Sequence, residues 1–324
     1  MRASYLRNIR RCFGCAAACS LLLGAAAYAD ADWELYKSRF VTAEGAVVDT
    51  YNHNMSHSES QGYGLMFALA NEDRPTFEKI LEWTLSHLKN PDNGLFYWSY
   101  RPEEADPTAD KNNASDGDLF IAWTLLKAGQ HWEERRYVRQ ANLLAEAILR
   151  ASTCSFAGSF ILLPGGTGFY NNTQVVVNPS YLIFPALEEF ARQTHLSTWQ
   201  RLNDDSHALL TRIQDMNVMI KIAPDWVELG AAGQMIPAPQ WPARSSYDAI
   251  RVPVYLFWAN PQDANLQPWR DWFSRFADNS NPAWVNVATG ETAGYMMTGG
   301  LAAVRSLVLT GTPGPTATLQ PDDD

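Results

Sequence analysis

Three short stretches of the sequence each place an acidic side chain just ahead of an apolar run. Glu59 lies in SHSESQGYG, Asp116 and Asp118 lie in NNASDGDLF, and Asp248 lies in ARSSYDAIR. Hydrolysis of a glycosidic bond requires only two carboxylic groups. One donates a proton to the leaving oxygen, and the other activates a water molecule or attacks the sugar. These residues are therefore candidates for a general acid and a general base.

Each acidic residue also has a purely structural interpretation. Glu59 and Ser56 match the Ser-x-x-Glu capping box of a helix start. In NNASDGDLF one aspartate fits an N-cap, although two acidic residues in three are more than capping needs. Asp248 and Arg251 are three residues apart and fit a helical ion pair, which is worth little when exposed. The recurrence at three helix starts of an acidic residue beside Ser, Tyr or Gly favours the chemical interpretation.

The tryptophans fit a carbohydrate ligand. All twelve follow residue 30, and Trp98 and Trp226 lie in segments without a clean helical period. A flat indole ring in a loop can stack on a sugar ring, whereas most of the other tryptophans are expected in the core, because aromatic side chains dominate burial.

A zinc hydrolase is an alternative suggested by HNMSHSE, in which His53 and His57 precede Glu59. The His-Glu-x-x-His order of metalloproteases is absent, and no third nitrogen or sulfur ligand is grouped with these residues in the sequence. No metal or other cofactor is therefore expected. His131 and His195 are isolated and are expected at the surface or in the core.

The first 29 residues have the pattern of an export signal. Four arginines precede an apolar stretch from Cys12 to Ala27, and Ala27-Tyr28-Ala29 has the small-x-small pattern of a cleavage site. The apolar stretch is shorter than the ~20 residues of a membrane span, so a retained anchor is the weaker alternative. We expect a removed signal peptide at residues 1–29 and a periplasmic or secreted protein without a membrane span after signal removal.

Charge and cysteine content limit the possible partners. Removal of a signal that holds four of the 25 basic residues and none of the 35 acidic ones would change the net charge from −10 to −14. Such a charge argues against nucleic acid or an anionic membrane as a partner. Of the four cysteines only Cys154 would remain, so no internal disulfide is expected.

Helical periodicity dominates the chain. Apolar residues recur at i, i+3, i+4 and i+7 over residues 63–70, 75–88, 119–126 and 137–148. Further helices are expected to begin near residues 178, 199, 248, 267 and 292. Strand signals are short, at Leu95–Trp98 and Val175–Val177. Long loops between many helices favour an all-α helical barrel over a bundle with tight turns.

No Pro/Gly/Ser-rich linker divides the middle of the chain, so residues 30–309 are expected to form one domain. The Pro-rich, apolar-poor segment 310–324 is expected to be a disordered tail.

The three acidic stretches also carry a family resemblance. ASDGDLFIAWTLLKAG resembles the signature of glycoside hydrolase family 8, and SESQGYGLMFAL and SSYDAIRVP resemble the family's segments for the catalytic acid and the catalytic base. Their order and spacing agree, and the similarity spans the chain after the signal. Within the family, the amino-acid sequences of these segments are most similar to those of the members encoded with bacterial cellulose synthase.

The resemblance implies an (α/α)6 barrel of six inner and six outer helices, with a cleft across one end. It also implies roles for individual residues: Glu59 is the general acid, Asp248 the general base, and Asp116 a carboxylate that hydrogen-bonds the sugar at the cleavage site. Tyr247 and Arg251 would flank the base, Trp98 would stack on a donor-side sugar, and Tyr181 would make another substrate contact. Asp118 would then be structural.

The implied activity is hydrolysis of a β-1,4-glucan, cellulose, with inversion, as an endoglucanase linked to cellulose biosynthesis and with the synthase complex as a further expected partner. Inversion requires carboxyl groups about 6.5–9.5 Å apart, so that a water molecule fits between base and sugar. A family 8 chitosanase, lichenase or xylanase and a non-catalytic glucan-binding protein remain alternatives.

Overall fold

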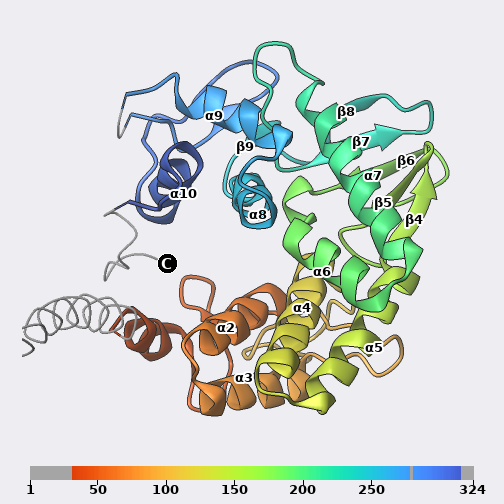
Figure 1. Cartoon of the computed structure of the whole chain (residues 1–324), viewed down its shortest axis with the longest axis vertical. Coiled ribbons are helices and arrows are strands. Elements are labelled where there is room, and N and C mark those ends of the chain that lie inside the picture. The colour runs from red at the N-terminus through yellow and green to blue at the C-terminus, as the bar shows by residue number, and fades with distance from the viewer. Residues whose placement is uncertain (1–30, 278–279, 315–324) are drawn as a thin grey trace, which may run out of the picture.

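The computed structural model describes residues 31–277 and 280–314 of the 324-residue chain (Figure 1). Helices make up most of it. Residues 31–40 are helical, and the helices that follow are α2 (Ser58–Ala70), α3 (Arg74–His87), α4 (Ser115–His131), α5 (Arg135–Ala151), α6 (Phe184–Thr194), α7 (Ser197–Gln214), α8 (Arg251–Ala259), α9 (Gln267–Phe273) and α10 (Gly299–Thr310). Two 3₁₀ turns, η1 (Pro179–Tyr181) and η2 (Ala264–Leu266), precede α6 and α9.

The helices alternate between an inner ring and an outer layer (Figure 1). Around the ring, α2, α4, α6, α8 and α10 each pack against the next, while α3, α5 and α7 pack against α2, α4 and α6 from outside and α9 packs against α10. This is the arrangement of an (α/α)6 barrel, and it confirms the predicted all-α class. Of the twelve helices that the resemblance implies, the described residues contain five of the inner ring, four of the outer layer and the helical residues 31–40.

The burial of α4 and α5 shows why one lies inside and the other outside. In α5 the predicted stripe and Ala147 are buried, whereas the remaining side chains are exposed or half-buried, as expected for an amphipathic outer helix. In α4 fourteen of seventeen residues are buried, which is typical of a helix surrounded by other elements. The stripe predicted over residues 119–126 therefore underestimated how completely this helix is enclosed.

Several predicted helix starts are displaced. The segment near residue 178 is the 3₁₀ turn η1, and α6 begins only at Phe184. The last helix begins at Gly299 rather than near residue 292. The helix expected from Asp248 begins at Arg251, so Asp248 lies in the preceding turn. Element boundaries are the least reliable part of a sequence-based prediction, because local patterns do not fix where a cap forms.

Small antiparallel sheets connect the loops: β1 (Val48–Asp49), β2 (Met55–His57) and β3 (Ser99–Tyr100); β4 (Thr153–Phe156) and β5 (Ser159–Leu162); β6 (Gln174–Val177), β7 (Val227–Gly230) and β8 (Met235–Pro237); and β9 (Arg244–Ser245) with β10 (Val285–Asn286). The strand predicted at Val175–Val177 is confirmed as part of β6. The strand predicted at Leu95–Trp98 is wrong, because Phe96 forms only an isolated bridge with Lys89 and β3 begins at Ser99.

The predicted signal peptide and residues 315–324 of the predicted tail lie outside the described residues. Thr310, where that tail was expected to begin, is the last residue of α10, and Gly311 ends the helix with φ 83° in the left-handed region, which glycine adopts readily. Within residues 31–277 and 280–314, no helix combines the length and the apolar character that a bilayer crossing requires.

Candidate active site

The three acidic segments converge at the N-terminal ends of inner helices. Glu59 is the second residue of α2, Asp116 is the second residue of α4, and Asp248 lies three residues before α8. Because α2 packs against α4 and Arg251 at the start of α8 contacts Glu59, residues far apart in the sequence form one cluster. The structure therefore brings the predicted acid, base and sugar-binding carboxylate together.

The Glu59 side chain takes no part in capping α2. The predicted capping box of Ser56 and Glu59 is wrong, because His57 is the N-cap: its Nδ1 accepts from the backbone N–H of Ser60 at 3.1 Å, and the Ser60 hydroxyl accepts from the His57 N–H at 3.3 Å. Burial lowers the pKa of His57, which keeps its ring neutral and able to accept. The Glu59 carboxylate is left for other contacts.

A glycine allows α2 and α4 to approach closely at this point. A Cβ atom at Gly117 would lie 2.7 Å from the Ser58 Cβ and 2.8 Å from the Glu59 backbone nitrogen, both closer than real Cβ contacts. Only glycine therefore fits between the two helix starts. The consequence is that Asp116 and Glu59 lie on neighbouring first turns.

The two aspartates of α4 have different surroundings, and neither is an N-cap as one of them was predicted to be. The N-cap is Ala114, without a side-chain hydrogen bond. Asp118 is fully buried and accepts from the Phe96 N–H and from the Asn113 side chain, each at 2.8 Å, and burial raises its pKa to about 7. Asp118 thus fastens the loop before β3 to α4.

Asp116 is 5% exposed and accepts a hydrogen bond from the Gly117 N–H at 2.8 Å. Burial, and then the negative charge of Glu59, raises the pKa of Asp116 well above its ordinary value. A carboxyl group with a raised pKa can remain protonated and act as a hydrogen-bond donor.

Arg251 links the predicted acid to the predicted base. Its Nη1 contacts Glu59 Oε1, and its Nη2 donates to Asp248 Oδ1 at 2.9 Å and to the Ser180 hydroxyl at 2.8 Å. The expected ion pair between Asp248 and Arg251 is present, but the guanidinium is mostly enclosed and serves both carboxylates. Arginine suits this position because its rigid fork presents several donors at once.

Two residues that the sequence analysis missed hold Asp248. Asn178 Nδ2 donates to Asp248 Oδ2 at 3.1 Å, while Asn178 Oδ1 accepts from the N–H and the hydroxyl of Ser180. The Asn-Pro-Ser turn could have been found as a turn signal, but nothing in the sequence links it to Asp248.

Asp225 is the second. It accepts from the backbone N–H groups of Ser246 and Ala249 at 2.9 and 2.8 Å and from the Ser246 hydroxyl. It thereby pins the turn that presents Asp248. Burial raises the pKa of Asp225, and the hydrogen bonds from these three donors act in the opposite direction.

The aromatic residues predicted to contact sugar lie next to elements of this cluster. Trp98 donates from Nε1 to Asp110 at 2.7 Å, and its carbonyl accepts from the Ser58 N–H at 3.0 Å, which places it beside the start of α2. Trp226 stacks on Trp241 with ring centroids 4.4 Å apart and an interplanar angle of 10°.

Tyr181 and Tyr247 differ in exposure. Tyr181 is largely enclosed, and burial, followed by the charges of Asp116 and Glu59, raises its pKa well above its ordinary value. Tyr247 is 56% exposed and its hydroxyl lies 2.8 Å from that of Tyr295. An open groove beside the turn is lined by Trp226, Trp241, Tyr247, Asp248, Trp284 and Tyr295.

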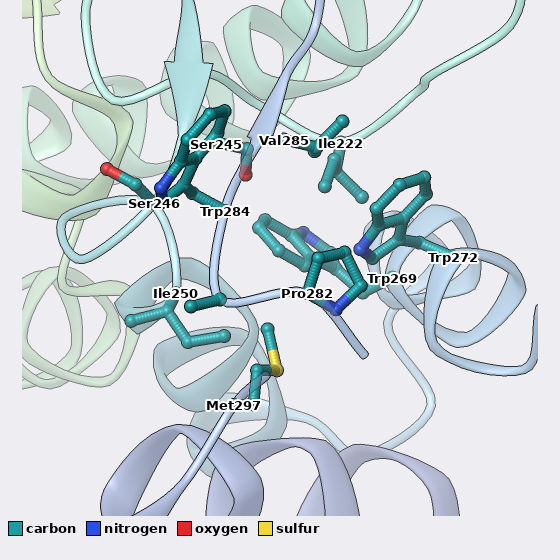
Figure 2. Close-up of a pocket in the computed structure, with 11 residues that line it drawn as sticks. Ile222, Ser245, Ser246, Ile250, Trp269, Trp272, Pro282, Trp284, Val285 and Met297 are labelled. Carbon is teal, nitrogen blue, oxygen red and sulfur yellow. The ribbon is translucent and has the colours of Figure 1, made fainter. Parts of the chain in front are cut away.

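A second, more enclosed pocket lies behind the same turn. Figure 2 shows its lining, in which Ile222, Ile250, Trp269, Trp272 and Met297 surround a small space beside β9 and β10. This lining is almost entirely apolar and has few groups that could hydrogen-bond a sugar. We interpret the pocket as packing that supports the turn.

Comparisons with known proteins identify the family of the chain. A model of the family described as "Glycosyl hydrolases family 8" matches residues 8–314. An endoglucanase from Cellulomonas uda is 45% identical over 290 residues, which cover 90% of this chain and 80% of that protein.

Solved structures give the same result. A family 8 endoglucanase from Klebsiella pneumoniae is 47% identical with a TM-score of 0.87, covering 91% of this chain and 94% of that one. The endo-β-1,4-glucanase CMCax from Acetobacter xylinum is 32% identical with a TM-score of 0.83, covering 88% and 89%. The resemblance inferred from the three acidic segments is confirmed: the chain belongs to glycosyl hydrolase family 8.

Proposed function

We propose that this chain is an endo-β-1,4-glucanase that hydrolyses cellulose with inversion, with Glu59 as general acid and Asp248 as general base. The observation that carries the proposal is the contact of one guanidinium, that of Arg251, with both Glu59 and Asp248. This shared contact keeps the two carboxyl groups near each other. The endoglucanase names of similar proteins support the substrate class.

The proposed reaction is a single displacement. Asp248 takes a proton from a water molecule while the water oxygen forms a bond to C1 on one face of the sugar. The bond from C1 to the glycosidic oxygen breaks on the other face, and that oxygen takes the proton of Glu59. One water molecule is consumed, Glu59 ends as a carboxylate, and Asp248 ends protonated.

Asp116 would hold the sugar at the cleavage point. Its raised pKa supports a neutral carboxyl group that donates to a sugar oxygen, in contrast to an ionised group that could only accept. Trp98, Tyr181 and Tyr247 would contact the flanking sugars, with Trp98 stacking on the donor side.

The cellular setting is also part of the proposal. We infer that residues 1–29 are a removed signal, that residues 30–309 are the catalytic domain, and that the enzyme acts in the periplasm or outside the cell on cellulose that the cell itself makes. N-terminal sequencing of the exported protein, expected to begin at Asp30, checks the first point. Unchanged cellulose output in a strain with Glu59→Gln would count against the link to synthesis.

Product analysis on carboxymethyl-cellulose, chitosan and xylan tests the function. We expect a fast fall in viscosity with few new reducing ends on the cellulose derivative alone. Glu59→Gln should lower that activity by about 10²- to 10⁴-fold, because the amide N–H is not acidic enough to transfer a proton to the leaving oxygen, while leaving binding intact.

The outcomes separate the alternatives. Activity confined to chitosan or xylan would keep the catalytic pair and replace the substrate. Near-wild-type activity of Glu59→Gln would refute the assignment of the acid, and wild-type protein that binds glucan without cleaving any substrate would support a binding protein.

A further inference from the structure

Two tyrosines from different helices form a chain of hydrogen bonds that ends on Glu59. The Tyr63 hydroxyl, one turn further along α2, donates to Glu59 Oε1 at 3.0 Å. The Tyr255 hydroxyl on α8 lies 3.0 Å from the Tyr63 hydroxyl. The proposed reaction uses neither tyrosine.

The direction of the chain follows from counting protons. A tyrosine hydroxyl has one proton to donate. Because the Tyr63 hydroxyl donates its one hydrogen bond to Glu59, the contact between the tyrosines requires Tyr255 as donor. The order is therefore Tyr255 to Tyr63 to Glu59.

Both tyrosines are held by packing. Tyr255 is 5% exposed, and the Tyr63 ring meets Phe120 edge-on with centroids 4.9 Å apart. Burial raises the pKa of both hydroxyls above their ordinary values, so both remain protonated donors over the whole range in which a glycoside hydrolase works.

The contacts of Glu59 are unevenly divided between its two oxygens. Tyr63 and Arg251 both contact Oε1. Among residues 31–277 and 280–314, no hydrogen bond to Oε2 is found. Oε2 is therefore the oxygen left to carry a proton toward the substrate.

We propose that Tyr63, held by Tyr255, is a positioning residue for the proton-donation step. This inference rests on the proposed role of Glu59 as general acid. Tyr63 fixes Oε1 so that Oε2 faces the glycosidic oxygen, and it stabilises the carboxylate that forms as Glu59 gives up its proton. Tyr63 keeps its own proton throughout.

Other charged and titratable groups also face Glu59 and Tyr63: Arg251 and Asp248 from α8 and its preceding turn, Asp116 from α4, His57 at the start of α2, and Tyr181 from η1. All of them remain in a variant that lacks only the Tyr63 hydroxyl. A change in that variant's pH profile therefore reports the hydroxyl.

The test is Tyr63→Phe, assayed on an unactivated cello-oligosaccharide and on 2,4-dinitrophenyl β-cellobioside, whose leaving group needs no proton. A hydrogen bond to a charged group corresponds to roughly a 10- to 100-fold effect. We expect kcat on the oligosaccharide to fall about 10-fold with KM little changed, and the activated substrate to be cleaved within about 2-fold of wild type.

The pH profile gives a second readout on the oligosaccharide alone. The basic limb reports loss of the proton donor, and removing a hydrogen bond to a carboxylate disfavours its ionised form. The basic limb of the profile should therefore move upward. Tyr255→Phe, which leaves the contact between Tyr63 and Glu59 in place, should give a smaller shift in the same direction.

Tyr137→Phe is a matched control, because Tyr137 is a buried tyrosine on the outer helix α5 whose hydroxyl donates to Glu78. Tyr137→Phe should change neither the basic limb of the pH profile nor the ratio of kcat on the two substrates. The inference would be overturned if Tyr63→Phe lost kcat equally on both substrates, or if the basic limb of its pH profile did not move. If Glu59→Gln instead retains activity on the oligosaccharide, the proposed function itself fails.

Discussion

At the residue scale, Arg251 joins the proposed acid to the proposed base, because its guanidinium contacts both Glu59 and Asp248. The two carboxyl groups have opposite requirements in the proposed reaction. Asp248 must be ionised to act as a base, whereas Glu59 must carry a proton to act as an acid. Substrate binding is therefore expected to loosen the contact between Arg251 and Glu59 more than the contact between Arg251 and Asp248.

Asp248→Asn tests the base at this scale. The amide cannot take a proton from water, so turnover of an unactivated glucan should fall about 10²- to 10⁴-fold. Azide is a nucleophile that needs no deprotonation, and it should restore turnover and give a glycosyl azide of inverted configuration. The measurement is the rate against azide concentration, with the anomer of the product identified.

Glu59→Gln under the same azide concentrations is the control, because azide cannot replace a proton donor. Rescue of both variants, or of neither, would contradict the separate roles assigned to the two carboxylates.

At the element scale, the turn ahead of α8 is held from outside by Asp225. Its carboxylate accepts hydrogen bonds from two backbone N–H groups and one hydroxyl, all within residues 246–249 of the turn. The Asp248 side chain is 36% exposed and accepts from Arg251 and Asn178, but the backbone that carries it belongs to this turn. The position of the base therefore depends on a residue that lies just ahead of β7.

Asp225→Ala should lower kcat on glucan about 10- to 100-fold, because two N–H groups lose their acceptor and the turn relaxes; an unsatisfied buried group costs about 1–3 kcal/mol. Asp225→Asn keeps an oxygen for the two N–H groups and should retain most of the activity. The measurement compares kcat, KM and melting temperature of both variants.

A loss of melting temperature without loss of kcat in Asp225→Ala would show that Asp225 supports the fold alone. Equal damage by alanine and asparagine would contradict the argument from its acceptor oxygen.

At the scale of the whole molecule, the net negative charge acts on polymers before they reach the site. The sequence carries a net charge of −10, and carboxymethyl-cellulose is also an anion. Raising the ionic strength from about 10 mM to about 150 mM shortens the Debye length from about 30 Å to about 8 Å and weakens this repulsion.

We therefore expect KM for carboxymethyl-cellulose to fall several-fold over that range, while KM for neutral cellohexaose changes less than about 2-fold. Initial rates on both substrates at constant pH provide the measurement. An equal change in KM for the two substrates would show that salt acts on the enzyme itself rather than on its encounter with the charged polymer.

The amino-acid sequence alone was sufficient for the fold class and for the three acidic segments. The apolar stripe of α5 recurs with the helical period, and that pattern is local. The motifs around Glu59, Asp116 and Asp248 are likewise contiguous, so they could be recognised without knowing how the helices pack.

Only the tertiary structure decided what those acidic residues touch. Arg251 and Tyr255 meet Glu59 and Tyr63 across 192 positions of the chain, and Asp225 reaches the turn before α8 from more than twenty positions away. The N-cap of α2 is likewise His57 and not Ser56. The physical reason is that periodicity and capping preferences act over a few residues, whereas hydrogen bonds in the site form wherever closure of the helical ring brings a donor to an acceptor.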